Sequence, residues 1–156
     1  GPGSIWVREP IKMAHRGRVV LPARGTGLLA PIYLDNLVDG MLLALSTPAA
    51  SGQVFTLTDG YGVQCRDYFG RLAALTGGRA RTLPTPLAVA LSRGAGALLR
   101  RLGQPNELSP ATMLMLARTG VYSNEKARHL LGFEPRVTYE QAMSLVEDWV
   151  RDEGLI

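Results

Sequence analysis

The chain has 156 residues, of which 46% are hydrophobic and 19% are charged. These fractions exclude a disordered tail, and a chain of this length buries enough surface to fold without disulfides or metals. The single cysteine, Cys65, excludes a disulfide framework and a multi-cysteine zinc site. His15 and His129 leave little for a metal cluster. No apolar run reaches the roughly 18 residues of a membrane span.

The positive charge is almost entirely arginine. Lys and Arg number 17 against 13 Asp and Glu, for a net charge of +4, and only Lys12 and Lys126 are lysines. We interpret the excess as a solubility feature, or as half of a charge pattern whose acidic half lies elsewhere; the alternative is an anionic ligand. The basic residues are not interleaved with aromatic side chains, so we expect no nucleic-acid partner.

The first four residues, Gly1 to Ser4, resemble the remnant of a cleaved expression tag and are set apart. The remaining sequence starts abruptly at Ile5 without a signal peptide. We therefore expect a cytoplasmic fragment of a longer protein.

Periodicity and capping residues predict short strands among helices. In the first half they predict a helix starting at Pro10 and ending at Gly17, a strand over 18–21, a turn over 24–27, a helix capped by Asp35 or Asn36, a loop over 48–52 and a strand over 54–58. In the second half they predict a helix over 66–76, a strand over 81–83, a helix over 86–102, a helix over 111–118 capped by Ser109, a helix capped by Ser123 and closed by Gly132, and a last helix opened by the capping box of Thr138 and Gln141.

So few and such widely separated strands cannot form a large independent sheet. The fold class we expect is α/β, as a mostly helical lobe with a few short strands that is built to pack against something else.

Two short motifs suggest cofactor chemistry. Residues 25–30 match G-x-G-x-x-A, the dinucleotide fingerprint, but Pro31 follows where that motif requires a helix N-terminus. We interpret the glycines as a tight turn between strands. Tyr122 and Lys126 match the Y-x-x-x-K pair of short-chain dehydrogenases, which requires both residues on one helix face. Because Tyr122 precedes the Ser123 cap, we do not expect this pair to share a helix.

Two hydrophobic segments have two interpretations each. Residues 113–117 are apolar all round, which is typical of a core helix, or of a soft wall of a ligand pocket. In the helix over 86–102 apolar and basic side chains fall on opposite faces, which fits a surface helix or a membrane-surface helix. The apolar set is Leu87, Leu91, Ala95, Leu98 and Leu102, and the basic pair is Arg93 and Arg100.

Three segments together resemble the C-terminal half of extended short-chain dehydrogenase/reductases. This group comprises the NAD-dependent epimerases and dehydratases, with a 3β-hydroxysteroid dehydrogenase-like branch. The segments are 31–40, similar to the family's strand-to-helix "v-[HY]-V-x-D-L"; 52–60, similar to "G-e-v-[FY]-n-v"; and 122–128 with 131–135, similar to "K-A-r-x-x-L-G-[WFY]-x-P". Their order, their spacing and the closing helix with Trp149 carry the resemblance.

The resemblance implies that residues 5–156 form a substrate-binding lobe, whereas a Rossmann domain outside this sequence carries the cofactor and the catalytic tyrosine and lysine. It implies NAD or NADP in the intact enzyme, and no catalytic, cofactor-binding or metal-binding residues in this lobe, which is inactive alone. The small-molecule substrate carries a carbonyl or an alcohol. The partner is the Rossmann domain, and the apolar face left without it predicts self-association of the fragment.

Two departures from the family pattern favour an apolar, steroid- or lipid-like substrate. Residues 28–30 stand where sugar-nucleotide members carry an arginine that meets the phosphates, and Arg118 matches their second arginine only loosely. We assign Arg118 as the polar substrate anchor, and the side chains Met113, Met115, Leu87 and Leu91 as the pocket wall. The rival hypothesis is a basic amphipathic module that binds a membrane surface or a protein.

Overall fold

The computed structural model describes residues 3–101 and 109–156. For residues 98–100 it describes the backbone alone. The chain forms two compact units, each described by itself below. Unit 1 contains the segments Ala30–Gly62 and Val121–Ile156, and unit 2 contains Ile5–Leu29 and Val63–Gly120. Each unit is therefore assembled from segments that are distant in the sequence.

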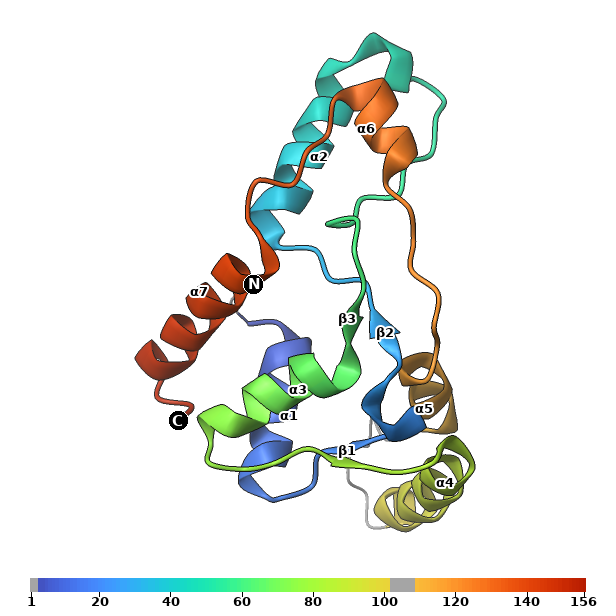
Figure 1. Cartoon of the computed structure of the whole chain (residues 1–156), viewed down its shortest axis with the longest axis vertical. Coiled ribbons are helices and arrows are strands. Elements are labelled where there is room, and N and C mark those ends of the chain that lie inside the picture. The colour runs from blue at the N-terminus through green and yellow to red at the C-terminus, as the bar shows by residue number, and fades with distance from the viewer. Residues whose placement is uncertain (1–2, 102–108) are drawn as a thin grey trace. The chain divides into compact units, whose positions relative to one another are not determined.

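Both units are mostly helical (Figure 1). Unit 2 contains α1 (Ile5–His15), β1 (Val20–Leu21), the 3-10 turn η1 (Ala23–Gly25), β2 (Leu28–Leu29), β3 (Val63–Gln64), α3 (Cys65–Leu75), β4 (Arg81–Thr82), α4 (Thr85–Arg101) and α5 (Pro110–Leu116). Unit 1 contains α2 (Leu34–Ser46), η2 (Pro48–Ala50), α6 (Glu125–Leu131) and α7 (Tyr139–Asp152). The strands form two ladders, parallel β1–β4 and antiparallel β2–β3. The expected mostly helical α/β lobe with a few short strands is confirmed.

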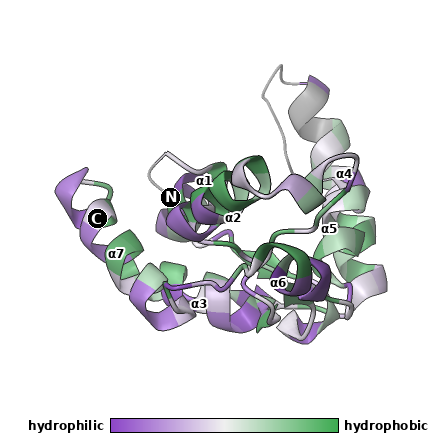
Figure 2. Cartoon of the chain, turned by 90° about the horizontal axis from the view of Figure 1, so that it is seen from above, coloured by the Kyte–Doolittle hydropathy of each residue, from purple (hydrophilic) through white to green (hydrophobic). Residues whose placement is uncertain are grey.

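The core of unit 2 lies between its helices and the β1–β4 ladder. The buried cluster comprises Ala14, Val19, Leu21, Cys65, Phe69, Ala73, Ala88, Met113 and Leu116. Helix α1 packs against α3, and α4 packs against α5. The mostly hydrophobic residues of α5 stand out in Figure 2.

The sequence predicted that Pro10 starts a helix. This is wrong, because Pro10 lies inside α1. A proline lacks the N–H that would bond the carbonyl four residues earlier, here that of Trp6. The hydroxyl of Tyr68, on α3, donates to this carbonyl at 3.1 Å. A contact from another helix thus satisfies the acceptor that the proline leaves open.

The glycines of residues 25–30 form a turn and not a nucleotide loop. Gly25 has φ +77°, which is the left-handed region. A Cβ on Gly27 would lie 1.9 Å from the carbonyl oxygen of Leu116, so only glycine fits there. Strand β2 and an extended segment follow in place of a helix. These residues offer no helix N-terminus, and they do not fit a dinucleotide pyrophosphate.

Unit 1 has a small core around Phe133. Ala127, Leu131 and Phe133 are buried, and partly buried side chains of α2 and of the segment before residue 58 pack against them. Gly132 closes α6 at φ +66°, as predicted. The capping box of α7 is also confirmed, because the side chain of Thr138 accepts from the Gln141 N–H and the Gln141 side chain accepts from the Thr138 N–H.

Asn36 was predicted as a possible helix cap, but its side chain instead links distant segments of unit 1 by hydrogen bonds. Helix α2 begins at Leu34 with Tyr33 as N-cap residue. The amide of Asn36 is 1% exposed. Its nitrogen donates to Asp59 Oδ1 at 2.8 Å and to the Val137 carbonyl at 2.9 Å, and its oxygen accepts from the N–H groups of Arg136 and Val137 at 3.0 Å each. One side chain thus joins three segments of unit 1.

Two other predictions of local structure are wrong. Residues 54–58 are not a strand, because the structure pairs them with no neighbouring strand among the described residues, and Val54 is 83% exposed. Ser123 is not the N-cap of α6; that position is held by Asn124. Ser123 instead accepts a hydrogen bond from the Glu125 N–H at 3.2 Å.

The predicted helix over 86–102 is confirmed as α4 up to Arg101. Leu102 lies outside the described residues, and so do the side chains of Leu98 and Arg100. Over 3–101 and 109–156, the structure has no helix that is both long and apolar enough to cross a membrane.

We expect Asn36→Ala to lower the free energy of unfolding by about 3 kcal/mol, because it leaves several buried polar groups without partners. Asn36→Asp replaces a donor to Asp59 with a second carboxylate. Its destabilisation should be largest at neutral pH and shrink as the pH falls and the carboxyls are protonated. Urea unfolding followed by circular dichroism measures both effects.

The matched control is Gln53→Ala, which removes an exposed amide and should change stability by less than about 0.5 kcal/mol. Equal stability of Asn36→Ala and the unmodified chain would contradict the role of this amide.

Candidate functional site

Arg118, the predicted substrate anchor, lies just after α5 and against β2. The Leu28 N–H donates to the Arg118 carbonyl at 2.7 Å, and the Arg118 Nε donates to the Leu28 carbonyl at 3.4 Å. The guanidinium is half-buried. This backbone pairing fixes where the Arg118 side chain leaves the backbone, and a guanidinium is a donor suited to a carbonyl or an anion.

Cys65 lies beside this arginine, at the first position of α3. Its thiol is fully buried and donates to the Leu116 carbonyl at 3.4 Å. Burial raises the pKa of the Cys65 thiol to about 11, against a smaller lowering by the positive charge of Arg118. The thiol is therefore protonated at neutral pH, which is unsuitable for a nucleophile.

The four predicted wall residues fall in two different environments of unit 2. Met113 is buried in the core cluster and Met115 packs against it. Leu87 and Leu91 lie one turn apart on α4 and are 47% and 55% exposed. Leu114, exposed on α5, was not singled out from the sequence. The methionines thus lie where a core helix would put them, and the leucines lie where a ligand or a surface can reach them.

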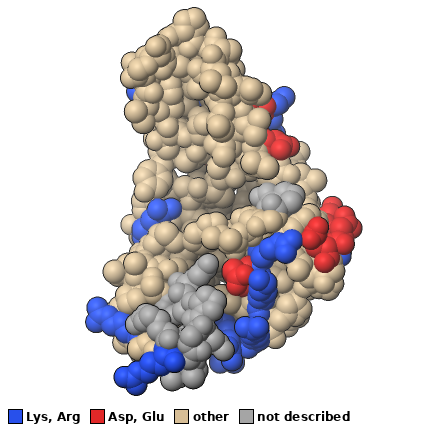
Figure 3. Space-filling view, turned by 180° about the vertical axis from the view of Figure 1, so that it is seen from behind, with Lys and Arg blue, Asp and Glu red and all other residues tan. Residues whose placement is uncertain are grey.

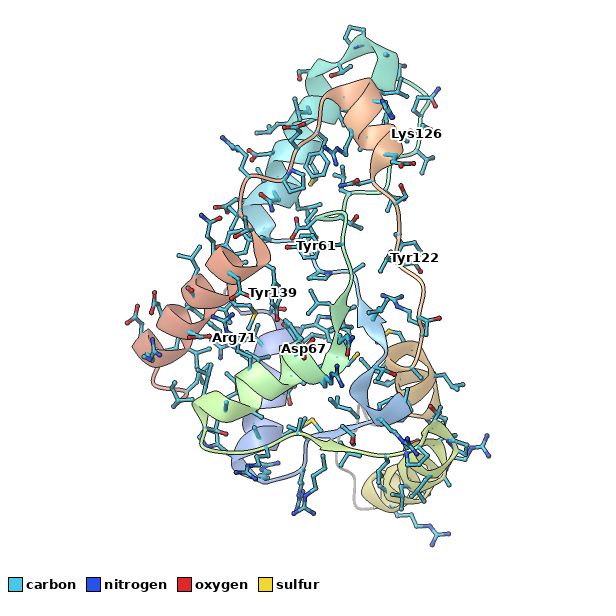
Figure 4. All side chains as sticks on the ribbon, viewed as in Figure 1. Tyr61, Asp67, Arg71, Tyr122, Lys126 and Tyr139 are labelled. Carbon is cyan, nitrogen blue, oxygen red and sulfur yellow. The ribbon has the colours of Figure 1, made fainter. Side chains whose placement is uncertain are left out.

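The sequence predicted that Tyr122 and Lys126 do not share a helix, and the structure confirms this. Tyr122 lies on the extended segment before α6, whereas Lys126 lies on that helix (Figure 4). The Lys126 ammonium lies 5.2 Å from the centre of the Phe55 ring. The i and i+4 geometry needed for a paired acid and base is therefore not formed.

A buried carboxylate and a half-buried phenol of unit 1 lie next to each other. Asp59 accepts from the Tyr33 N–H at 3.3 Å, from Tyr61 at 3.5 Å, and from Asn36. Burial raises the pKa of Asp59 despite these donors, and burial together with the charge of Asp59 raises the pKa of Tyr61 to about 12. A catalytic phenol needs the opposite shift. This cluster, which sequence reasoning missed, is accordingly a structural one.

An open groove of about 630 Å³ runs along α2 in unit 1. Its residues are Asp39, Leu42, Leu43, Ser46, Gly132, Glu134 and Arg136. The guanidinium of Arg136 holds Asp39 through its Nε at 2.9 Å. Outside residues 1–2 and 102–108, no three His, Cys, Asp or Glu side chains are grouped so as to hold a metal.

The described side chains therefore suit binding and orientation of a ligand better than proton transfer. Arg118 and the exposed leucines of α4 and α5 all lie in unit 2. This unit is the candidate ligand-binding part of the chain.

Comparisons with known proteins bear on the chain as a whole. No protein-family model matches the chain. An uncharacterized protein of Escherichia coli K12, YbjS, is 26% identical over 147 residues, which is 91% of this chain and 44% of that protein. A 4-hydroxy-2-methyl-3-oxo-4-farnesyl-3,4-dihydroquinoline-1-oxide ketoreductase of Stigmatella aurantiaca is 32% identical over 123 residues, which is 76% of this chain and 36% of that enzyme.

Solved structures of epimerases share the fold. An epimerase of Methanothermobacter thermautotrophicus matches 95% of this chain with a TM-score of 0.65 and 17% identity. A UDP-glucose 4-epimerase of Thermotoga maritima matches 98% with a TM-score of 0.62 and 21% identity. The chain covers 38% and 41% of these two proteins. The chain thus spans less than half the length of the relatives and structures it matches, and its fold is that of a part of such enzymes.

We expect Cys65 to react with a thiol reagent at pH 8 at least about a hundredfold more slowly in the folded chain than after unfolding, because its pKa is raised by about two units. Since the raised pKa favours the protonated folded state, this contribution to stability is present below the unfolded pKa and lost as the pH rises through about 11. Arg118→Gln should raise the pKa further and slow the reaction, whereas Arg93→Gln, on the exposed side of α4, should not.

Rates that rise in the Arg118→Gln variant while it stays folded would contradict the electrostatic pairing of Arg118 with this thiol.

Proposed function

We propose that this chain is the C-terminal, substrate-binding portion of an extended short-chain dehydrogenase/reductase. In the intact enzyme, NAD or NADP bound by a Rossmann domain supplies the hydride chemistry. The residues of this chain bind the substrate and hold its carbonyl or alcohol in place. The observation that carries the proposal is the fold, which matches nearly all of this chain and about two fifths of each epimerase.

The substrate class follows from the side chains around Arg118. Leu28 is hydrogen-bonded to Arg118 through the backbone, and Leu29 follows it. By the family resemblance, sugar-nucleotide enzymes carry one arginine at the place of residues 28–30 and a second at the place of Arg118. This chain therefore provides one guanidinium beside leucines. This combination suits one polar oxygen on an apolar body. The Stigmatella relative is named for a substrate that carries a keto group and a farnesyl chain.

Within this proposal Arg118 donates to the substrate oxygen, while Leu87 and Leu91 meet the apolar body. Met113 and Met115 support these side chains from the core, because Met113 is buried in the core cluster of unit 2 and Met115 packs against it. Their flexible thioethers let that packing adapt to the shape of the substrate. The isolated chain is expected not to turn over.

The partner in this proposal covers an apolar face of α2. The opposite side of α2 already packs against the Phe133 core of unit 1. The exposed members of the face fall on one helical stripe: Leu34, Val38, Met41, Leu42 and Leu45. A helix that is apolar on both sides is normally buried, so we assign this face to the Rossmann domain. We propose a cytoplasmic location for the intact enzyme.

Calorimetry with farnesylacetone and with UDP-glucose tests the substrate class. The chain should bind the apolar ketone and not the nucleotide sugar. Arg118→Gln should weaken ketone binding about tenfold or more, by loss of a charged hydrogen bond. Leu91→Ser should weaken it about fivefold, by loss of apolar contact. The control Arg128→Gln, in unit 1, should leave it unchanged; tight UDP-glucose binding without ketone binding would refute the apolar substrate.

Sedimentation velocity tests the apolar face of α2. The chain should self-associate as its concentration rises, because this face lacks its partner. The double variant Met41→Ser with Leu45→Ser should shift it towards monomer, whereas Leu114→Ser, which changes an exposed leucine of unit 2, should not. A monomer at every concentration argues against the assigned face.

A further inference from the structure

The net charge of +4 conceals a strong separation of charge between the two units. Unit 2 contains 13 of the Lys and Arg residues and 3 of the Asp and Glu residues, a formal charge of +10. Unit 1 contains the other 4 cationic and 10 anionic residues, a formal charge of −6. On the side seen in Figure 3, the Lys and Arg side chains gather over unit 2. The excess of positive charge in unit 2, the candidate ligand-binding unit, is therefore much larger than the net charge of the whole chain indicates.

Part of this charge lies on and just before the strands of the β1–β4 ladder. Val20 pairs with Arg81, and Arg18 and Arg79 each lie two residues before these partners. Arg18 and Arg79 precede the two-residue strands and Arg81 lies on β4; all three are exposed, whereas Val19 and Leu21 are buried in the core. We name these three exposed residues the arginine face.

The described residues offer the arginine face no ion-pair partner. Within residues 3–101 and 109–156, no acidic side chain lies within 4.0 Å of these three guanidinium groups. Arginines of unit 1 are paired instead: Arg151 with Asp148 at 3.1 Å and Arg128 with Glu134 at 3.6 Å. Like charges on neighbouring strands repel each other. An external anionic surface would remove that repulsion.

Apolar side chains accompany the arginine face. Helix α4 starts three residues after β4, and Figure 1 shows β1, β4 and α4 along one edge of unit 2. Leu87 and Leu91 are exposed on α4, on a flank that the core does not use, and Arg93 is exposed on the same helix. Basic groups beside exposed leucines are the pattern of surfaces that bind anionic bilayers.

We propose that unit 2 docks on an anionic lipid surface through the arginine face and the exposed leucines of α4. The guanidinium groups pair with lipid phosphates, and Leu87 and Leu91 enter the boundary between headgroups and acyl chains. The docking stands on charge and exposure alone. Its link to a lipid-like substrate, which would reach the site from the bilayer, rests on the proposed function.

Co-sedimentation with vesicles tests the docking. The chain should bind vesicles of phosphatidylcholine mixed with phosphatidylglycerol and not vesicles of phosphatidylcholine alone, and binding should fall as salt rises. The double variant Arg79→Gln with Arg81→Gln should lower the partition constant about 25-fold, about fivefold for each charge. Leu91→Ser should lower it about fivefold without changing its salt dependence.

The matched control is Arg128→Gln with Arg151→Gln, which makes the same change of net charge in unit 1. It should retain vesicle binding, and circular dichroism verifies that every variant is folded. The proposal is overturned if the control loses as much binding as the test variant, or if the chain binds neither vesicle. It is also overturned if the chain binds duplex DNA but not vesicles, or if the arginine variant changes only self-association. Ketone binding is measured separately, so failure of the docking leaves the substrate assignment intact.

Discussion

A buried amide, that of Asn36, holds unit 1 together. Its four hydrogen bonds reach a turn 23 residues away and a segment about 100 residues away in the chain. Buried polar groups are costly unless they are paired, so this amide selects one arrangement of α2, the turn at Asp59 and the entry to α7. It thereby fixes the direction of α2, on whose apolar face the proposed contact with a cofactor-binding domain depends.

Unit 2 is organised differently, around a hydrophobic cluster and short backbone ladders. The β2–β3 ladder and the pairing of Leu28 with Arg118 place an arginine beside a buried thiol and two leucines. The raised pKa values of Cys65 and Tyr61 keep both groups protonated. Neither group is suited to proton transfer, and the hydride chemistry of the proposed enzyme belongs to its cofactor. The division of charge between the units fits a division of tasks between contact with a protein domain and contact with ligand or lipid.

The features that the sequence predicted well are those set by neighbouring residues. The capping box at Thr138, the Ser109 cap and the left-handed Gly132 each depend on a few adjacent positions. The dinucleotide fingerprint was rejected correctly because Pro31 follows it directly.

The predictions that failed depend on contacts between distant residues. Pro10 lies inside a helix because a tyrosine 62 residues from Trp6 satisfies the open carbonyl. Asn36 was taken for a cap because its bonding partners are remote in the sequence. The burial that raises the pKa of Asp59, and the separation of charge between interleaved segments, likewise appear only once the chain is folded.

The central claim is that this chain holds a substrate while another region of the protein holds the dinucleotide. Fluorescence titration of the chain with NADH tests that claim most directly. No saturable change in nicotinamide emission is expected at any protein concentration. A saturable signal at one NADH per chain would contradict it.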